Sequence, residues 1–100
     1  MITVRVISKS TLRMFWKKHA DVEQSLKSWH LEACQAKWKS PNSIKKDYPS
    51  ASIINNERVV FNIRGNKYRL VVKINYQFKA VWIRFIGTHA EYNSIDATQI

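Results

Sequence analysis

The chain has 100 residues, 45% of them hydrophobic, with only two glycines and two prolines, which predicts one folded domain over residues 1–100 and excludes a disordered chain. Its formal charge of +10 indicates an acidic partner: phosphate polymers are the commonest, while an acidic protein or an unoccupied basic surface stays open. A single cysteine excludes an internal disulfide, and the absence of a transmembrane run or signal peptide predicts a cytoplasmic protein without membrane contact.

A strand and a short helix are predicted to open the chain. Ile2, Val4 and Val6 alternate with other side chains over residues 2–7, which is the period of a strand. Either Ser8 or Ser10 then offers an N-cap, and apolar residues at helical spacing predict a helix that runs through Lys18.

A second helix is predicted between Asp21 and about Trp38. Asp21 followed by Gln24 resembles a capping box, which would satisfy free N–H groups of the first turn. The apolar stripe from Val22 to Ala36 gives this helix one face to bury. Because the connection between the two helices is short, we expect an antiparallel pair that packs on one face of a sheet.

The second half of the chain predicts a meander of strands. Ser40 and Pro41 can begin a short helical turn that ends before Pro49. Gly65 and Asn66 predict a tight turn, because both residues tolerate positive φ. Apolar side chains at period two predict strands, with a brief extended piece before them, over residues 52–54, 58–64, 68–74 and 81–86.

These elements predict an α+β fold. An N-terminal strand and a two-helix hairpin come first, followed by an antiparallel meander of three to four strands. Placing the first strand beside the last one gives a sheet of four or five strands, with the helices on one face. We expect the other face to be open.

The open face is predicted to be cationic. Strand alternation places on it the side chains of Asn62, Arg64, Lys67, Arg69, Lys73, Trp82 and Arg84. Like charges that face one another across a sheet cost stability, so their clustering indicates that an anion lies among them. Each of these residues alone could be ordinary solvated surface.

The chemistry that fits these residues is metal-free cleavage of RNA. The histidines at positions 19, 30 and 89 are far apart in the sequence, and no acidic pair has ligand spacing, so we expect neither a metal nor a cofactor. RNA can be cleaved by its own 2′-hydroxyl if His89 transfers a proton and nearby cations stabilise the charge on phosphorus. Tyr68, Trp82 and Tyr92 could stack on splayed bases.

Two segments carry a resemblance to a known family. The runs Y-R-L-V-V-K-I-N-Y and W-I-R-F-I-G-T-H-A-E-Y-N-S-I-D-A, at residues 68–76 and 82–97, resemble the HigB-type toxins of toxin–antitoxin systems within the RelE-like group. The resemblance implies an endoribonuclease that cuts mRNA in the 30S A site of the translating ribosome. It also implies a HigA-like helix-turn-helix antitoxin, bound as a heterotetramer.

The family pattern is carried over residue by residue. It implies catalytic roles for six positions, which are Arg64, Lys67, Arg69, Arg84, His89 and Tyr92. Contacts to RNA are expected from Asn62, Tyr68, Lys73 and Trp82. RelE itself has further basic residues just after the last strand, where this chain reads Thr88 to Glu91, so we expect His89 to take the role in proton transfer.

Two other functions fit the same architecture. A ParE-like toxin would inhibit gyrase, and it would have no need for His89 and Tyr92 beside a basic patch. A non-catalytic module that binds RNA or the ribosome would need the cations and Trp82, but it would tolerate the loss of His89.

Overall fold

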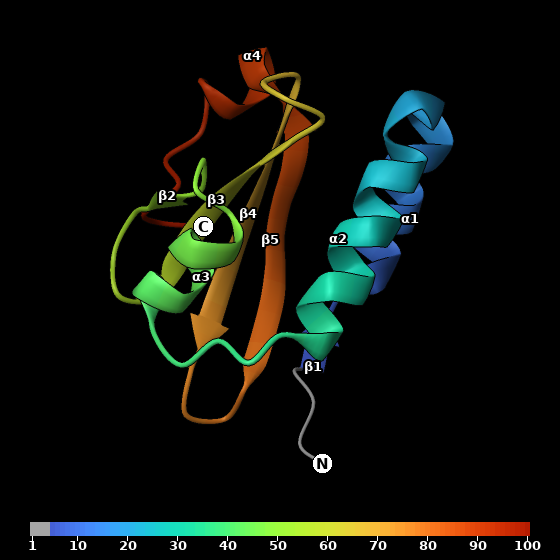
Figure 1. Cartoon of the computed structure of the whole chain (residues 1–100). Helices are drawn as coiled ribbons and strands as arrows, with labels where there is room; N and C mark the ends of the chain where they lie inside the picture. Colours follow the sequence, from blue (N-terminus) through green and yellow to red (C-terminus); the bar gives the residue numbers. More distant parts are fainter. Residues whose placement is uncertain (1–4) are drawn as a thin grey trace.

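The computed structural model describes residues 5–100 (Figure 1). The strands are β1 (Arg5–Ile7), β2 (Ser52–Ile53), β3 (Arg58–Ile63), β4 (Tyr68–Asn75) and β5 (Ala80–Thr88). The helices are α1 (Lys9–Lys18), the single 3₁₀ turn η1 (Ala20–Val22), α2 (Glu23–Gln35), α3 (Pro41–Asp47) and α4 (His89–Tyr92). None of the helices described here is long and apolar enough to cross a membrane.

The strands form one five-stranded sheet in the order β1-β5-β4-β3-β2. β1 runs parallel to β5, and every other neighbouring pair is antiparallel. The prediction of an α+β fold, with the first strand beside the last one, is confirmed. Of the predicted opening strand, Ile2 and Val4 lie outside the described residues.

One face of the sheet carries the main core, covered by α1, α2 and α3. In Figure 1 the α1–α2 pair stands along β5, and α3 lies beside the opposite half of the sheet. The helices contribute Leu12, Trp16, Leu26, Trp29, Ala33 and Ile44, and the strands contribute Val59, Phe61, Ile63, Tyr68, Leu70, Val72, Ile74, Val81 and Ile83. Apolar burial of this extent, at about 25 cal/mol per Å², is the main force that holds the helix pair on the sheet.

The second helix begins and ends differently from the prediction. Asp21 lies in η1, and its carboxylate binds the sheet instead of capping α2, so the predicted capping box is wrong. α2 ends at Gln35, before Trp38. Trp38 is nevertheless buried, because its ring stacks on Phe61 of the main core, and its indole N–H donates to Asp47 Oδ2 at 3.0 Å.

A β-bulge in β5 changes the alternation that the sequence predicted. Val71 of β4 pairs with Phe85, whereas Val72 pairs with Ile83, so Arg84 is the extra residue. As a result Phe85 turns away from the helices and Ile86 packs against the main core. Strict alternation from Val81 and Ile83 along the predicted strand 81–86 would point Phe85 inward and Ile86 outward, and this prediction is wrong at both residues.

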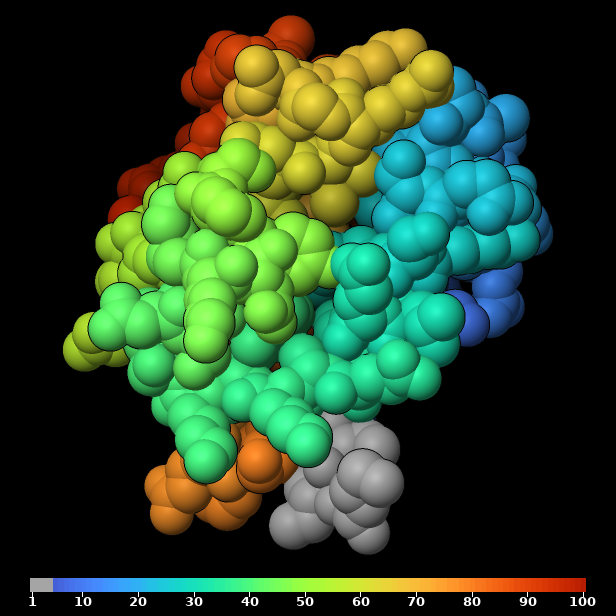
Figure 2. All heavy atoms as spheres, in the orientation of Figure 1, coloured from blue at the N-terminus to red at the C-terminus, as the bar shows by residue number. Residues whose placement is uncertain are grey.

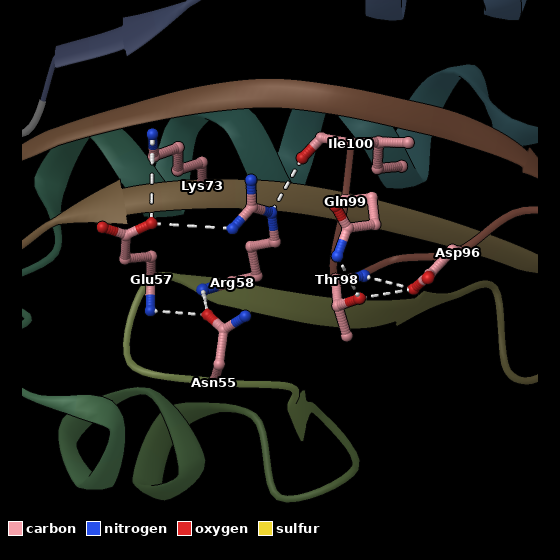
Figure 3. Close-up of polar contacts among 8 residues, drawn as sticks. All are labelled: Asn55, Glu57, Arg58, Lys73, Asp96, Thr98, Gln99 and Ile100. Carbon is pink, nitrogen blue, oxygen red and sulfur yellow. Dashed lines mark hydrogen bonds and ion pairs between the residues drawn. The ribbon is translucent and has the colours of Figure 1, made fainter.

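The second face of the sheet is partly covered, which corrects the prediction of an open face. The segment after α4 folds back over it, so that Tyr92, Ile95, Ala97 and Ile100 pack with Ile54, Val60, Val71 and Phe85. At its end the Arg58 side chain donates to the carbonyl oxygen of Ile100 at 2.8 Å (Figure 3). Glu57 lies 3.5 Å from Arg58 and 3.9 Å from Lys73, so part of this face is an ion-paired rim.

Candidate functional site

Three segments that are distant in the sequence meet at one end of the sheet. They are the turn between β3 and β4, the corner between α1 and α2, and the junction between β5 and α4. In Figure 2 the atoms of the β3–β4 turn fill the space between the red α4 region and the blue α1–η1 corner. We call this region the turn end; it holds four of the side chains that the sequence singled out, Arg64, Lys67, Arg69 and His89.

Asp21 gathers the cations of the turn end around one carboxylate. Its Oδ2 accepts from Arg64 Nη1 at 2.7 Å and from Lys67 Nζ at 2.6 Å, and its Oδ1 accepts from the Tyr68 hydroxyl at 2.7 Å. The hydrogen bonds from Lys67 and Tyr68 lower the pKa of Asp21 to about 2. The same carboxylate raises the pKa of Lys67, so both partners stay charged.

The turn itself has an unusual backbone. Arg64 has φ of 54° and Gly65 has φ of 67°, so the left-handed pair is Arg64 and Gly65 instead of the predicted Gly65 and Asn66. A residue with a Cβ costs about 1–2 kcal/mol in this conformation. Arg64 also donates to the backbone carbonyl of Asp21 at 2.9 Å, and these contacts offset that cost while they fix the direction of the guanidinium.

His89 is held at the first position of α4. The Thr88 hydroxyl accepts from the Glu91 N–H at 3.2 Å, and Glu91 Oε1 accepts from the Thr88 N–H at 2.8 Å, which together form a capping box. The second of these bonds lowers the pKa of Glu91. The backbone N–H of His89 donates to the Lys67 carbonyl at 3.1 Å, so the backbone of His89 is anchored beside the cationic turn and its side chain is exposed.

Arg69 lies next to this turn on β4. Its position in the sheet is opposite Gly87 on one side and Asn62 on the other. The guanidinium folds back toward the turn, where Nη1 donates to the Asn66 carbonyl at 3.0 Å and lies 3.3 Å from the Tyr68 carbonyl oxygen. Gly87, opposite Arg69, leaves room for the Phe85 ring, which a Cβ at this position would approach at 2.5 Å.

Tyr68 does not have the exposure that base stacking requires. Its ring is 2% exposed and belongs to the main core, and burial raises the pKa of its hydroxyl. Its ring lies in edge contact with Phe15 and with His19, at centroid distances of 5.5 and 5.7 Å. The predicted stacking of Tyr68 on a base therefore does not fit the structure, and Tyr68 instead connects Asp21 to the core.

Two residues of the turn end were not predicted as site residues. His19 stacks on Phe15 at 4.3 Å and lies in edge contact with Tyr68, whereas the sequence was used only to exclude it as a metal ligand. Asp21 was assigned to a helix cap. The signal in the sequence was that Asp21 is one of only seven acidic residues in the chain and lies two residues after His19.

The remaining predicted residues lie elsewhere on the sheet. Lys73 and Trp82 face one another across β4 and β5, four residues along β4 from Arg69, which is about 13 Å of strand. Arg84 is exposed on the bulge, and Tyr92 is half-buried against the second-face cluster. The Asn62 amide donates to the Ser50 carbonyl at 3.1 Å. The structure thus brings Arg64, Lys67, Arg69 and His89 together, with Asn62 opposite Arg69 on β3, and leaves Lys73, Trp82, Arg84 and Tyr92 apart.

A crevice of about 360 Å³ lies between α1 and β5. It is lined by Thr11, Met14, Phe15, Lys18 and Ile86, and Met14 is 66% exposed. Because Phe15 also stacks on His19, the crevice adjoins the turn end. Among residues 5–100, no group of three histidine, cysteine, aspartate or glutamate side chains could hold a metal ion.

A basic α+β chain with a short mixed sheet, a helix pair on one face and a histidine beside clustered cations is the class of small toxin that the sequence resembled. Comparison with known families agrees: residues 22–95 match HigB_toxin, described as the RelE-like toxic component of a toxin-antitoxin system. The chain belongs to this family. The prediction of a HigB-type toxin is confirmed.

Three curated relatives extend the likeness over most of the chain. They are the mRNA interferase toxin HigB of Escherichia coli (strain K12) and the mRNA interferases HigB of Escherichia coli O157:H7 and Shigella flexneri. Each is 25% identical over 96 residues, which cover 94% of this chain and 92% of the relative. The expectation of an enzyme agrees with the names of these relatives.

Proposed function

We propose that this toxin is a metal-independent endoribonuclease that cleaves mRNA during translation, in the A site of the 30S ribosomal subunit. The observation that carries the proposal is the exposed His89, anchored to the Lys67 backbone beside Arg64 and Arg69. The names of the curated relatives support the substrate. Because ribosomes translate in the cytoplasm, we expect the protein to act there, without membrane contact.

The reaction needs only proton transfer and charge stabilisation. The 2′-hydroxyl loses its proton, its oxygen bonds to the adjacent phosphorus, and the bond from phosphorus to the 5′-oxygen breaks as that oxygen gains a proton. The products are a 2′,3′-cyclic phosphate and a 5′-hydroxyl. His89 transfers a proton, and Lys67 and Arg69 lie where cations can stabilise the charge on the phosphorane oxygens.

Asp21 orients two cations of the turn end, Arg64 and Lys67, for binding phosphate. In the free protein it accepts from both Arg64 and Lys67, so these side chains are held in place before RNA binds. A phosphate that approaches the turn meets donors that are already oriented, which lowers the entropic cost of binding it. Lys67 has three donors, so it can keep Asp21 and still donate to phosphate.

The other predicted contact residues bind the RNA strand at positions distant from the phosphate that reacts. Trp82 and Lys73 form a pair of neighbours on the second face, and Arg84 is exposed between them and the turn end. A half-buried indole offers one face to a base, and the cations offer contacts to phosphates. Tyr92 packs on the second-face cluster, and we assign it to positioning of α4 and His89.

Membership of the family implies an antitoxin partner, and the details are part of the proposal. We propose that the antitoxin is a HigA-like helix-turn-helix protein and that the complex is a heterotetramer. This arrangement places two copies of the toxin on one antitoxin dimer. The molar mass of the co-purified complex by light scattering tests it, and a mass for one copy of each chain would contradict it.

Induced expression in a bacterium tests the proposed activity. Wild type should arrest growth and cleave messages within their translated frames, whereas His89→Ala and Arg69→Ala should do neither at the same protein level. Lys46→Ala removes an exposed cation from α3, far from the turn end, and serves as the matched control. Growth arrest with intact messages and inhibited gyrase would support a ParE-like toxin instead, and binding to ribosomes without cleavage would support a non-catalytic module.

A further inference from the structure

A groove of about 330 Å³ lies between α1 and α2, outside the turn end. It is lined by Lys9, Arg13, Trp16, Lys27, His30, Leu31 and Cys34. On α1 these residues follow the spacing i, i+4 and i+7, and on α2 the spacing i, i+3, i+4 and i+7, so each helix presents one continuous stripe to the groove. α2 packs on the sheet through a different stripe, Leu26, Trp29 and Ala33.

The floor of this groove is apolar, and it is formed in part by Trp16 of the main core. Leu31 is 58% exposed, although Leu26 and Trp29 of the same helix are almost completely buried. Trp16 and the half-buried Cys34 continue the apolar floor. A single exposed leucine is ordinary, but one that lines a groove offers an anchor point to a partner.

The rim of the groove is cationic. Lys9 and Arg13 stand one turn apart on α1, and neither has an ion-pair partner among residues 5–100. Lys27 stands on the α2 side, where it pairs with Glu23 at 2.5 Å and lies over the Trp16 ring at 5.4 Å. Burial and the nearby Lys9 lower the pKa of His30, so the groove disfavours a further positive charge.

We propose that the α1–α2 groove binds an acidic amphipathic helix of the cognate antitoxin. Two antiparallel helices with an apolar channel accept a third helix by ridges-into-grooves packing. α1 has 10 residues, about 15 Å, so the partner helix needs about three turns. Its apolar residues would contact Leu31 and Trp16, and its carboxylates would pair with Lys9 and Arg13.

A protein helix fits this groove better than RNA. Phosphate contacts need cations but no apolar floor, whereas the core of a protein interface is apolar with charges at its rim. The groove also lies along the helices, away from His89 at the turn end. A bound antitoxin would therefore inhibit the toxin by steric hindrance, because it would prevent the toxin from entering the ribosome. This consequence rests on the proposed function.

Calorimetric titration of the purified cognate antitoxin tests the groove directly. The toxin carries His89→Ala throughout, so that it can be produced without harm and binding does not depend on cleavage. We expect Arg13→Glu and Leu31→Asp each to weaken binding at least about tenfold, as the reversal of a rim charge and the loss of an anchor residue do in other interfaces. Lys46→Glu makes the same charge change on α3 and should leave the affinity unchanged.

Circular dichroism and thermal unfolding of each variant show whether it is folded. Unchanged affinity in both folded groove variants, or equal losses in Lys46→Glu, would overturn the proposal. So would a loss of ribosome binding with intact antitoxin binding, which would make the groove an RNA contact. If wild type does not cleave mRNA, the proposed function fails, while the calorimetric result for the groove stands by itself.

In cells, the groove variants in the otherwise wild-type toxin give a complementary result. Arg13→Glu should still arrest growth when it is expressed alone, since Arg13 is remote from the turn end. Co-expression of the antitoxin should then rescue growth with wild type and with Lys46→Glu, but not with Arg13→Glu. Full rescue of Arg13→Glu would contradict the proposal.

Discussion

His89 is positioned by backbone contacts more than by its own side chain. Its N–H binds the carbonyl of Lys67, and Thr88 and Glu91 close the first turn of α4 around it. The ring is left exposed. A group whose backbone is fixed and whose ring is free can meet a substrate without first breaking a contact inside the protein.

The substitution His89→Ala should reduce mRNA cleavage by about 10²-fold or more, which is the usual contribution of a positioned acid or base. Arg69→Ala should reduce it as well, because the guanidinium next to the turn stabilises charge on phosphorus. Cleavage in a reconstituted translation system measures both effects, with circular dichroism to show that the folds are intact. Cleavage by a folded His89→Ala at the wild-type rate would remove the residue from the mechanism.

Asp21 makes stability depend on pH in a defined range. Its pKa in the folded protein is about 2, below its ordinary value of 3.8, so its contacts stabilise the fold above pH 4 and are lost as the pH falls toward 2. Asp21→Asn lacks this contribution. We therefore expect the difference in melting temperature between wild type and Asp21→Asn to be largest above pH 4 and to shrink toward pH 2.

The matched control for this measurement is Glu23→Gln. It removes an ion pair between neighbouring turns of α2, and such solitary surface pairs contribute little. Its melting temperature should stay close to that of wild type across the same range. A pH-independent difference for Asp21→Asn would contradict the role of its carboxylate.

Among the elements, α4 is the one whose existence depends most on its cap. It has four residues, too few to be stable by itself, so the capping box and the bond from His89 to Lys67 maintain it. The segment that follows crosses the second face and packs on Val60 and Val71. Substitutions in the capping box should therefore affect both the stability of the fold and the position of His89.

Thr88→Ala should destabilise the fold by about 1 kcal/mol, as the loss of a helix N-cap usually does. It should also lower cleavage, because the first turn of α4 then frays and His89 loses its fixed place. Denaturant unfolding and the translation assay measure the two effects. Thr98→Ala removes a local hydroxyl contact to Asp96 and serves as the control; equal effects from both substitutions would contradict the role of the cap.

The strands and helices with a clear apolar period were predictable from the sequence. The period of two over β3 and β4, and the helical stripes of α1 and α2, depend on neighbours within one element. The bulge at Arg84 was not predictable, because Phe85 and Ile86 are both apolar and either could face the core. The segment after α4 carries too few apolar residues to reveal that it covers the second face.

The candidate site was predictable in its residue types and less so in its arrangement. Arg64, Lys67, Arg69 and His89 were expected near one another, and the structure places them at the turn end. Asp21 was missed because the pattern D-x-x-Q is also that of a helix cap, and only the long-range pairing with Arg64 and Lys67 decides between the two. Contacts over more than 40 residues leave no periodic signal.

At the scale of the whole molecule, the formal charge of +10 is divided among distinct surfaces. Arg64 and Lys67 of the turn end share Asp21, Lys73 shares Glu57 with Arg58, and the α1–α2 groove holds a third set. An RNA-rich target such as the ribosome attracts all of them. The two shared acids keep Arg64 and Lys67 at the turn end, and Arg58 and Lys73 on the second face, in place.

Association with ribosomes should weaken steeply between about 50 and 200 mM salt, because each phosphate contact releases counterions. Arg84→Gln, which removes an exposed cation from the bulge, should reduce the slope of log affinity against log salt by about 0.7–0.9, the value for one phosphate contact. Co-sedimentation over a salt series measures it. If association with ribosomes does not change with salt concentration, the basic surface is not the surface that binds the ribosome.

The chemical ends of the cleaved message test the proposed reaction most directly. Attack by the 2′-hydroxyl leaves a 2′,3′-cyclic phosphate upstream and a 5′-hydroxyl downstream, and we predict these ends at cuts within translated frames. They should be present with wild type and Lys46→Ala and absent with His89→Ala. A 3′-hydroxyl upstream with a 5′-phosphate downstream would contradict the account, because water and not the RNA itself would then be the nucleophile.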